Sequence, residues 1–317
     1  MAVVVNPAIN RIFQQFDTEL IRAISGAPRV WTAFGLEVPS SGRSTLHAWL
    51  AQTAAFVREW KDGRALNEMG TLAWEIINRK WEISWKFSEE QIRDDESGLV
   101  AMAIAMARAG GTKWAEHEDT LVAQTVQAGK TKACFDGQNF FATTHPTDPL
   151  GLLAGTFSNL LTVKPLNHAN LITALQTIRG YKLPDGSPWV GPATPIKLVV
   201  ESTNLEPAKQ IVGLPWLSTA AAYGLAGANA PSMNVMQGAV ELVYNPYFNN
   251  EPGVWYLAAE NSGVRPIIFQ RRQGVETQEL GPGSQIYFDR KEYRIGQDAR
   301  YEASYAHPQL MIRVEPT

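Results

Sequence analysis

The stretch from 71 to 88, TLAWEIINRKWEISWKFS, constrains the fold of this chain more than any other segment. Apolar and polar residues alternate along both of its halves, which is the pattern of strands with one covered face. Asn78-Arg79 lies between the halves and predicts the turn of a hairpin. The apolar positions are Leu72, Trp74, Ile76, Trp81, Ile83, Trp85 and Phe87.

A hairpin this apolar needs a covering surface, because an isolated two-stranded ribbon is only marginally stable in water. The rest of the chain offers no obvious partner for it. We therefore expect the seven apolar residues to contact a neighbouring subunit. A chain that its neighbours must cover is first of all an assembly protein.

Composition excludes several other classes of protein. The chain has 317 residues, of which 19% are charged, against an average of about 25%. The formal net charge of −3 gives no electrostatic footprint for nucleic acid or an anionic membrane. One cysteine rules out an internal disulfide, and neither a signal peptide nor a membrane-length apolar run is present. We expect synthesis in a cytosol and no membrane partner.

The remaining patterns predict a mixed α+β fold. Apolar residues at helical spacing run from Pro7 to a stop at Gly26, and a shorter helix is expected over 46–60. An alanine-rich helical region covers 97–128 with an interruption at Gly110-Gly111. A helix opened by Asn167 and another over 205–212 follow, separated by a buried strand. The expected strands are 195–201, 240–244, 254–258, 266–270 and the period-two segments of the tail.

The stretch 134–146, CFDGQNFFATTHP, holds the only residues that suggest chemistry. Cys134, Asp136 and His145 are close in sequence and could form a thiol nucleophile with a base, but no oxyanion element or activating context accompanies them. Asp136-Gly137 is more simply a tight turn, ordered by His145 and anchored in the core by Phe140 and Phe141.

Other polar clusters favour structural roles as well. Asp94 and Asp95 precede the long helix and are expected to cap it, since they lack the ligand pattern of a calcium loop. The histidines show no metal-binding spacing, and no phosphate loop or dinucleotide fingerprint occurs. We predict no catalytic residue, no cofactor and no metal.

The order of these elements resembles that of the major head subunits of Mu-like bacteriophages, the gpT family, a branch of the Hong Kong 97 capsid fold. The resemblance covers 66–160 and is weaker beyond that. Three groups of residues carry it: Asn78, Trp81 and Glu82; then Ile92, Asp94, Asp95 and Gly98; then Phe135, Asp136, Gly137, Phe140, Phe141, His145 and Pro146.

The resemblance implies four parts. Residues 1–62 would form an N-terminal arm region, and 63–95 an extended β-hairpin lying over an adjacent subunit. Residues 96–165 and 288–317 would form a peripheral domain with a long spine helix. Residues 166–287 would form an axial domain.

The resemblance also implies a function and partners. The chain would be a major capsid protein that assembles through hexamers and pentamers into an icosahedral shell around double-stranded DNA, without specific DNA binding. Scaffold or protease, portal and decoration proteins would be further partners, and the virion would form in the cytoplasm of a host bacterium. Two alternatives stay open: a cellular encapsulating compartment on the same fold, and a hydrolase with a site in 129–165.

Overall fold

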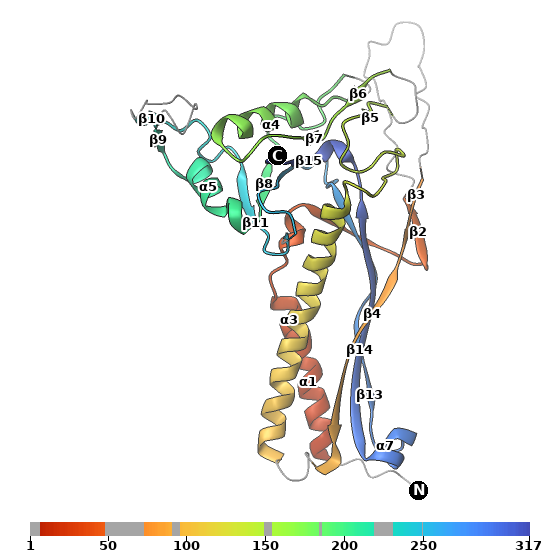
Figure 1. Cartoon of the computed structure of the whole chain (residues 1–317). Helices are drawn as coiled ribbons and strands as arrows, with labels where there is room; N and C mark the ends of the chain where they lie inside the picture. Colours follow the sequence, from red (N-terminus) through yellow and green to blue (C-terminus); the bar gives the residue numbers. More distant parts are fainter. Residues whose placement is uncertain are drawn as a thin grey trace, which may run out of the picture.

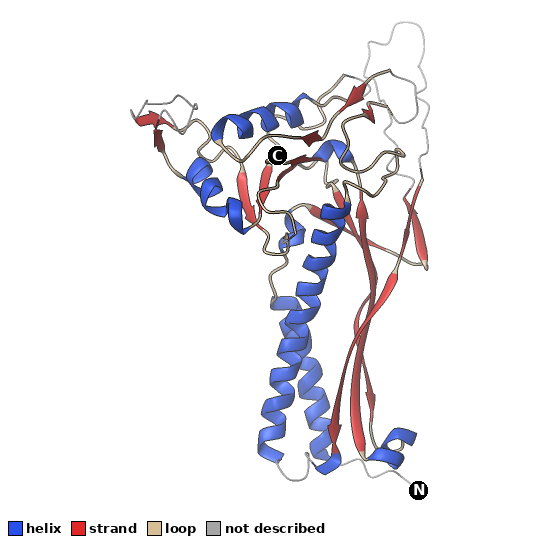
Figure 2. Cartoon of the chain, in the orientation of Figure 1, coloured by secondary structure: helices blue, strands red, loops and turns tan. Residues whose placement is uncertain are grey.

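The computed structural model describes residues 7–47, 73–90, 96–148, 154–183, 186–218, 231–248 and 250–317. It has two parts, a long stem and a lobe at one end of the stem (Figure 1). The stem is a layer of two helices lying beside a layer of strands, and the lobe is a sheet flanked by shorter helices (Figure 2). The fold is therefore α+β, as predicted.

Two helices run along the stem, α1 (Pro7–Gly26) and α3 (Glu96–Ala128). The predicted interruption at Gly110-Gly111 is wrong, because α3 is continuous through both glycines. Their role is close packing. A Cβ at Gly111 would lie 2.5 Å from the Cβ of Ala23 on α1, and one at Gly110 would lie 2.8 Å from the Trp85 ring. The glycines let α1 and the strand layer approach the α3 backbone.

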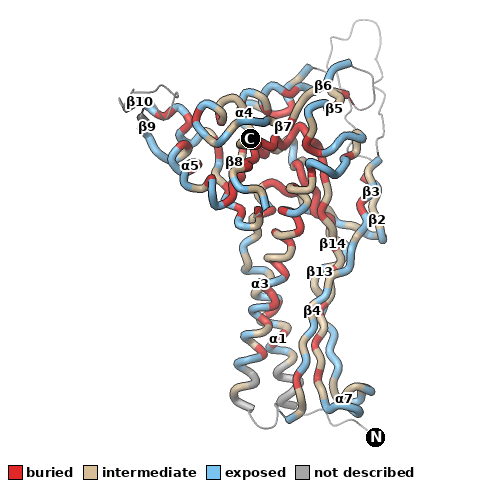
Figure 3. Tube along the Cα trace, in the orientation of Figure 1, coloured by how far each residue is buried: buried red, intermediate tan, exposed pale blue. Residues whose placement is uncertain are grey.

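The strand layer of the stem is a four-stranded sheet in the order β1-β13-β14-β4. The central strand, β14 (Glu292–Tyr305), is antiparallel to β13 and to β4. Its residues alternate between buried and half-buried along the whole length, so one face packs on the helices (Figure 3). The other strands are β1 (Gly35–Pro39), β13 (Ile267–Leu280) and β4 (Arg79–Ser88).

The apolar ribbon therefore has a partner within its own chain, and the expectation that it lacks one is wrong. The Trp85 ring packs edge-on against Phe16 of α1, with 5.6 Å between ring centroids. The Trp81 ring lies 4.3 Å from the ring of His117 on α3. Phe87 is buried, while Trp81, Ile83 and Trp85 keep partial exposure.

The predicted turn at Asn78-Arg79 is also wrong. β3 (Trp74–Ile77) leads almost directly into β4, and the antiparallel partner of β3 is β2 (Ser44–His47), which lies earlier in the chain. The chain does not turn at Asn78. The side-chain nitrogen Nδ2 of Asn78 donates to Ser40 Oγ at 2.9 Å and to the Gly42 carbonyl at 3.0 Å. Ile76 is buried on the inner face of this pair, and the Trp74 indole donates to Ser304 Oγ.

The lobe is built on a five-stranded sheet in the order β11-β8-β12-β15-β7. Its helices are α4 (His168–Gly180) and α5 (Ser202–Gly213), near the predicted positions, and the Asn167 side chain caps α4 as expected. The strands are β7 (Leu160–Leu161), β8 (Lys197–Val200), β11 (Glu241–Tyr244), β12 (Trp255–Ala258) and β15 (Met311–Val314).

Short elements complete the fold. A hairpin of β9 (Trp216–Ser218) and β10 (Pro231–Met233) lies at the outer end of the lobe (Figure 1). The others are η1 (Val30–Ala33), β5 (His145–Pro146), β6 (Thr156–Phe157), α7 (Gln285–Arg290) and η3 (Pro308–Leu310). Among the described helices, none is both long and apolar enough to cross a membrane.

Several predicted features fall outside the described residues. These are Leu72, Asp94, Asp95 and most of the helix expected over 46–60, of which Leu46 and His47 belong to β2. The four-part division stays a prediction. Strand pairing runs across its boundary at 287/288, because β13 pairs with β14 along the stem.

We predict that Gly111→Ala destabilises the subunit by about 1–3 kcal/mol, since overpacking against the backbone of α1 outweighs the gain in helix propensity. Gly26→Ala at the end of α1 is the matched control, because nothing lies within 4 Å of a Cβ there. Urea unfolding of both variants measures the difference. Equal midpoints would contradict the close-packing role of Gly111.

Candidate functional site

Of the residues that suggested chemistry, Cys134 and Asp136 lie in the loop between α3 and β5, and His145 begins β5, at the junction of stem and lobe. Gly137 has φ +81°, the left-handed region, and its amide donates to the Cys134 carbonyl at 3.0 Å. This confirms the tight turn at Asp136-Gly137. Phe140 and Phe141 are fully buried in the core that the stem and lobe share, as their predicted anchoring role requires.

Cys134, Asp136 and His145 meet through the Asp136 carboxylate. The Cys134 thiol donates to Asp136 Oδ1 at 2.9 Å, and the Gln138 amide donates to the same oxygen at 3.0 Å. His145 Nδ1 lies 2.6 Å from Asp136 Oδ2. The carboxylate thus stands between the thiol and the imidazole. His145 faces Asp136, so it is not positioned to deprotonate Cys134 directly.

Asn159 fixes the other side of the His145 ring. Its amide nitrogen donates to the carbonyls of Phe140, Pro308 and Met311 at 2.7, 3.0 and 3.2 Å, so its oxygen points the other way. That oxygen accepts from the Ala142 amide and lies 3.2 Å from His145 Nε2. Both His145 nitrogens therefore face oxygens, and the buried ring is held between the Asp136 carboxylate and the Asn159 amide.

The electrostatics of this cluster oppose nucleophilic chemistry. Burial is the largest influence on the Cys134 thiol and raises its pKa far above the ordinary value, and the Asp136 charge raises it further. Burial also acts to raise the pKa of Asp136, but hydrogen bonds from His145, Cys134 and the Gln138 amide outweigh it, and the pKa is lowered. The thiol stays protonated and the carboxylate stays ionised.

The same three side chains could in principle hold a metal ion, since one ligand atom from each lies within 4.8 Å of the others. Their hydrogen bonds already satisfy the thiol, both carboxylate oxygens and both ring nitrogens. The cluster is therefore explained without an ion. The absence of a metal site stays a prediction.

A second polar cluster ties the same junction together. The Arg313 guanidinium on β15 forms a bidentate pair with Glu251 at 2.6 and 2.8 Å. Arg313 Nε donates to Glu315, which also accepts from Lys130 just beyond the end of α3. The Arg313–Glu251 pair lies within the lobe, and the Lys130–Glu315 pair links the end of the stem helix to the lobe sheet. Sequence reasoning missed them, because their members are far apart in the chain.

A third cluster lies on the stem. Glu118 of α3 is almost fully buried between two guanidinium groups, with Arg29 Nε and Arg271 Nη1 each 2.8 Å from one of its oxygens. Arg271 also pairs with Glu37 at 2.6 Å and lies over the Phe269 and Tyr301 rings. Buried charges paired in this way hold α3, β1 and β13 in one arrangement.

Comparisons with known proteins agree with this architecture. Residues 9–163 and 248–317 match the family described as the Mu-like prophage major head subunit gpT. The match covers more than half of the chain, so the chain belongs to this family of phage head subunits, which confirms the resemblance seen in the sequence. Because the family consists of structural proteins, the hydrolase alternative loses its support.

Two curated relatives are similar over part of their length. The Mu-like prophage FluMu major head subunit of Haemophilus influenzae is 32% identical over 147 residues, which are 46% of each chain. The major capsid protein of Escherichia phage Mu is 28% identical over 148 residues, 46% of this chain and 47% of that protein. The matched region thus spans about half the length of these relatives.

Solved structures support the fold alone, since their sequence identities are low. The procapsid of bacteriophage JBD30 gives a TM-score of 0.57 at 22% identity, covering 98% of this chain and 75% of that one. The virus-like particle from Pyrococcus furiosus gives 0.51 at 10% identity, covering 96% and 99%. One is a procapsid and the other a virus-like particle. The fold of this chain is the Hong Kong 97-type capsid fold, as predicted from the sequence.

We expect His145→Ala to lower the free energy of unfolding by about 2–4 kcal/mol, because it leaves the Asp136 carboxylate buried without the His145 hydrogen bond. Cys134→Ser keeps a donor to Asp136 and should cost far less. Chemical unfolding of the two variants gives the comparison. A His145→Ala variant as stable as Cys134→Ser would refute the structural role of the His145–Asp136 contact.

Acid should weaken the same junction through His307. Burial lowers the pKa of His307 to about 4, and its ring packs on Phe135 and Trp189. The unfolded chain takes up this proton at about pH 6.5 and the folded chain only near pH 4. The His307 contribution to stability is therefore fully present above pH 6.5 and falls by about 3 kcal/mol as the pH drops to 4.

Thermal unfolding between pH 7 and 4 measures this loss, with His307→Phe as the matched variant that keeps an aromatic ring. Burial also lowers the pKa of His117, which leaves a smaller slope of the same sign in that variant. An unchanged slope in His307→Phe would show that His307 does not carry the effect.

Proposed function

We propose that this chain is the major capsid protein of a Mu-like phage or prophage, and that its activity is assembly with copies of itself into a closed shell. Membership in the head-subunit family carries the proposal. The structure supports it physically, since the stem is only one helix layer and one strand layer thick. Such a flat subunit exposes broad surfaces that neighbours can cover.

The partners and location follow the same proposal. Hexamers and pentamers of the chain would form an icosahedral shell enclosing double-stranded DNA, assembled in the cytoplasm of the host bacterium. A net charge of −3 favours confinement of the DNA over specific binding. Scaffold or protease, portal and decoration proteins would complete the particle.

In this proposal the β2–β3 pair contacts neighbouring subunits through its outer face. On the β2–β3 pair, Ile76 and His47 point inward and are buried, whereas Leu46 and Ile77 are 63% and 53% exposed. The partly exposed Trp74, Trp81, Ile83 and Trp85 remain candidates, but their inner packing makes them part of the subunit core as well. Leu46 and Ile77 are the cleaner test of an inter-subunit role.

We predict that the purified wild-type chain forms rings or closed particles, far above the 35.0 kDa of one subunit, in negative-stain images and light scattering. The double variant Leu46→Ser/Ile77→Ser should fold normally and assemble poorly, since the apolar area it loses is buried only between subunits. Trp85→Ser, in contrast, should lower the stability of the subunit itself, because it opens the contact with Phe16.

A stable wild-type monomer at micromolar concentration, with no larger species at any salt concentration, would contradict the capsid proposal. Normal particles from the Leu46→Ser/Ile77→Ser variant would contradict only the proposal that the outer face of the β2–β3 pair contacts neighbouring subunits.

A further inference from the structure

The outer end of the lobe carries an uncharged apolar surface that the described part of the chain leaves exposed. Leu214, Trp216, Met233 and Val235 are exposed there by 46%, 60%, 66% and 61%. Trp216 and Met233 are directly paired on the β9–β10 hairpin, so both point to the same side. We call the Trp216–Met233 pair the knob. The sequence contains no Asp, Glu, Lys or Arg between Lys209 and Glu241.

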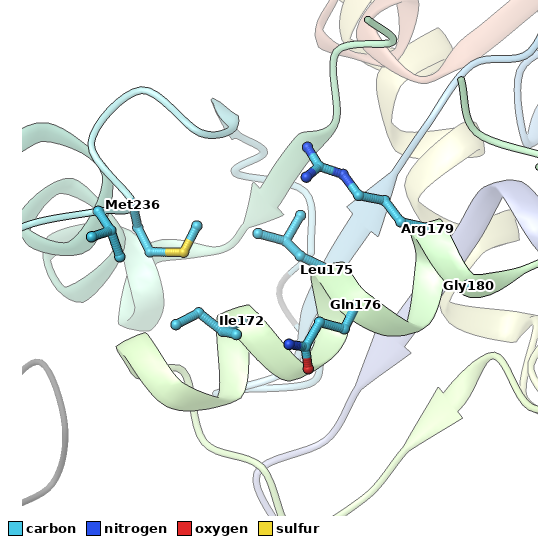
Figure 4. Close-up of a pocket in the computed structure, with 7 residues that line it drawn as sticks. Ile172, Leu175, Gln176, Arg179, Gly180 and Met236 are labelled. Atoms are coloured by element: carbon cyan, nitrogen blue, oxygen red, sulfur yellow. The ribbon is translucent and has the colours of Figure 1, made fainter. Parts of the chain in front are cut away.

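A pocket of about 550 Å³ lies beside the knob on the same lobe. Its walls are one side of α4, with Ile172 and Leu175, and the turn that follows the hairpin, with Val235 and Met236 (Figure 4). Figure 4 shows the Ile172, Leu175 and Met236 side chains facing one space. A pocket of this size accommodates a bulky side chain, since ligand pockets measure about 300–1,000 Å³.

The rim of the pocket carries one cation. Arg179, in the last turn of α4, is exposed, and among the described residues it has no ion-pair or hydrogen-bond partner. A guanidinium group stacks favourably on the face of a tryptophan. The pocket therefore offers what an uncharged knob with an exposed indole requires: apolar walls and a cation, without an acidic group among its lining residues.

We propose that the knob of one subunit inserts into this pocket on a second copy of the chain, with Trp216 against Arg179. Knob and pocket are different surfaces of one molecule, so the contact is heterologous and generates rings rather than isolated pairs. This inference rests on the proposed shell function but adds a specific contact to it. It concerns residues 164–247, which lie outside the family match.

The test uses variants with one added cysteine each, because the native Cys134 is buried and does not compete for a thiol reagent. Met233→Cys marks the knob, and Gln176→Cys marks an exposed position on the pocket rim. The two variants are assembled separately and as an equal mixture, treated with a short bismaleimide, and run on a denaturing gel. We expect covalent dimers from the mixture and none from either variant alone.

Each other outcome overturns the proposal in a recognisable way. Particles without dimers from the mixture would refute the contact while leaving the capsid function intact. Dimers from Met233→Cys alone would show a symmetric contact of two knobs instead. Failure of the wild type to assemble would remove the proposed function and the contact together. As an independent measure, we expect Trp216→Ser to lower particle yield about tenfold or more while its circular dichroism is unchanged.

Discussion

The packing of α3 against β14 is the contact on which the rest of the structure depends. Trp114 of α3 illustrates it: the ring is buried at 2% exposure, and the indole donates to Gln297 of β14 at 2.8 Å. His117, one helical turn on, bonds the Tyr301 hydroxyl at 2.7 Å. These polar contacts inside an apolar layer fix how the helix lies on the strand. β13, β4 and α1 then add to the two sides of this pair.

The junction of stem and lobe is held by a different kind of interaction. Asn159 bonds three carbonyls and orients His145, and Arg313 joins Glu251 to Glu315. Both clusters link segments that are well separated in the sequence. Cys134, Asp136 and His145, which suggested a thiol nucleophile with a base, thus hold the 134–145 loop in place. Burial of this cluster disfavours a Cys134 thiolate and strengthens the hydrogen bonds among its members.

Sequence reasoning predicted the elements whose periodicity is strong. The N-terminal helix, the lobe strands and the Asp136-Gly137 turn follow from local pattern and from residues that favour one backbone conformation. Prediction from the sequence failed where contacts with a distant segment determine the local structure. Asn78 looked like a turn residue, yet its amide binds the 40–43 loop. Gly110-Gly111 suggested an interruption of the long helix, yet the two glycines allow α1 and the Trp85 ring to pack closely against the α3 backbone. The ribbon seemed unpartnered because β14 lies more than two hundred residues later.

The central claim is that the core of the stem stabilises each subunit on its own, whereas the outer faces of the β2–β3 and β9–β10 pairs contact other copies of the chain. Amide hydrogen exchange, compared between assembled particles and dissociated subunits, tests it most directly. We predict that assembly adds protection to β2–β3 and β9–β10, while α3, β14 and the 134–145 loop are already protected in the free subunit. Added protection confined to α3 and β14, with none on the hairpins, would contradict the account.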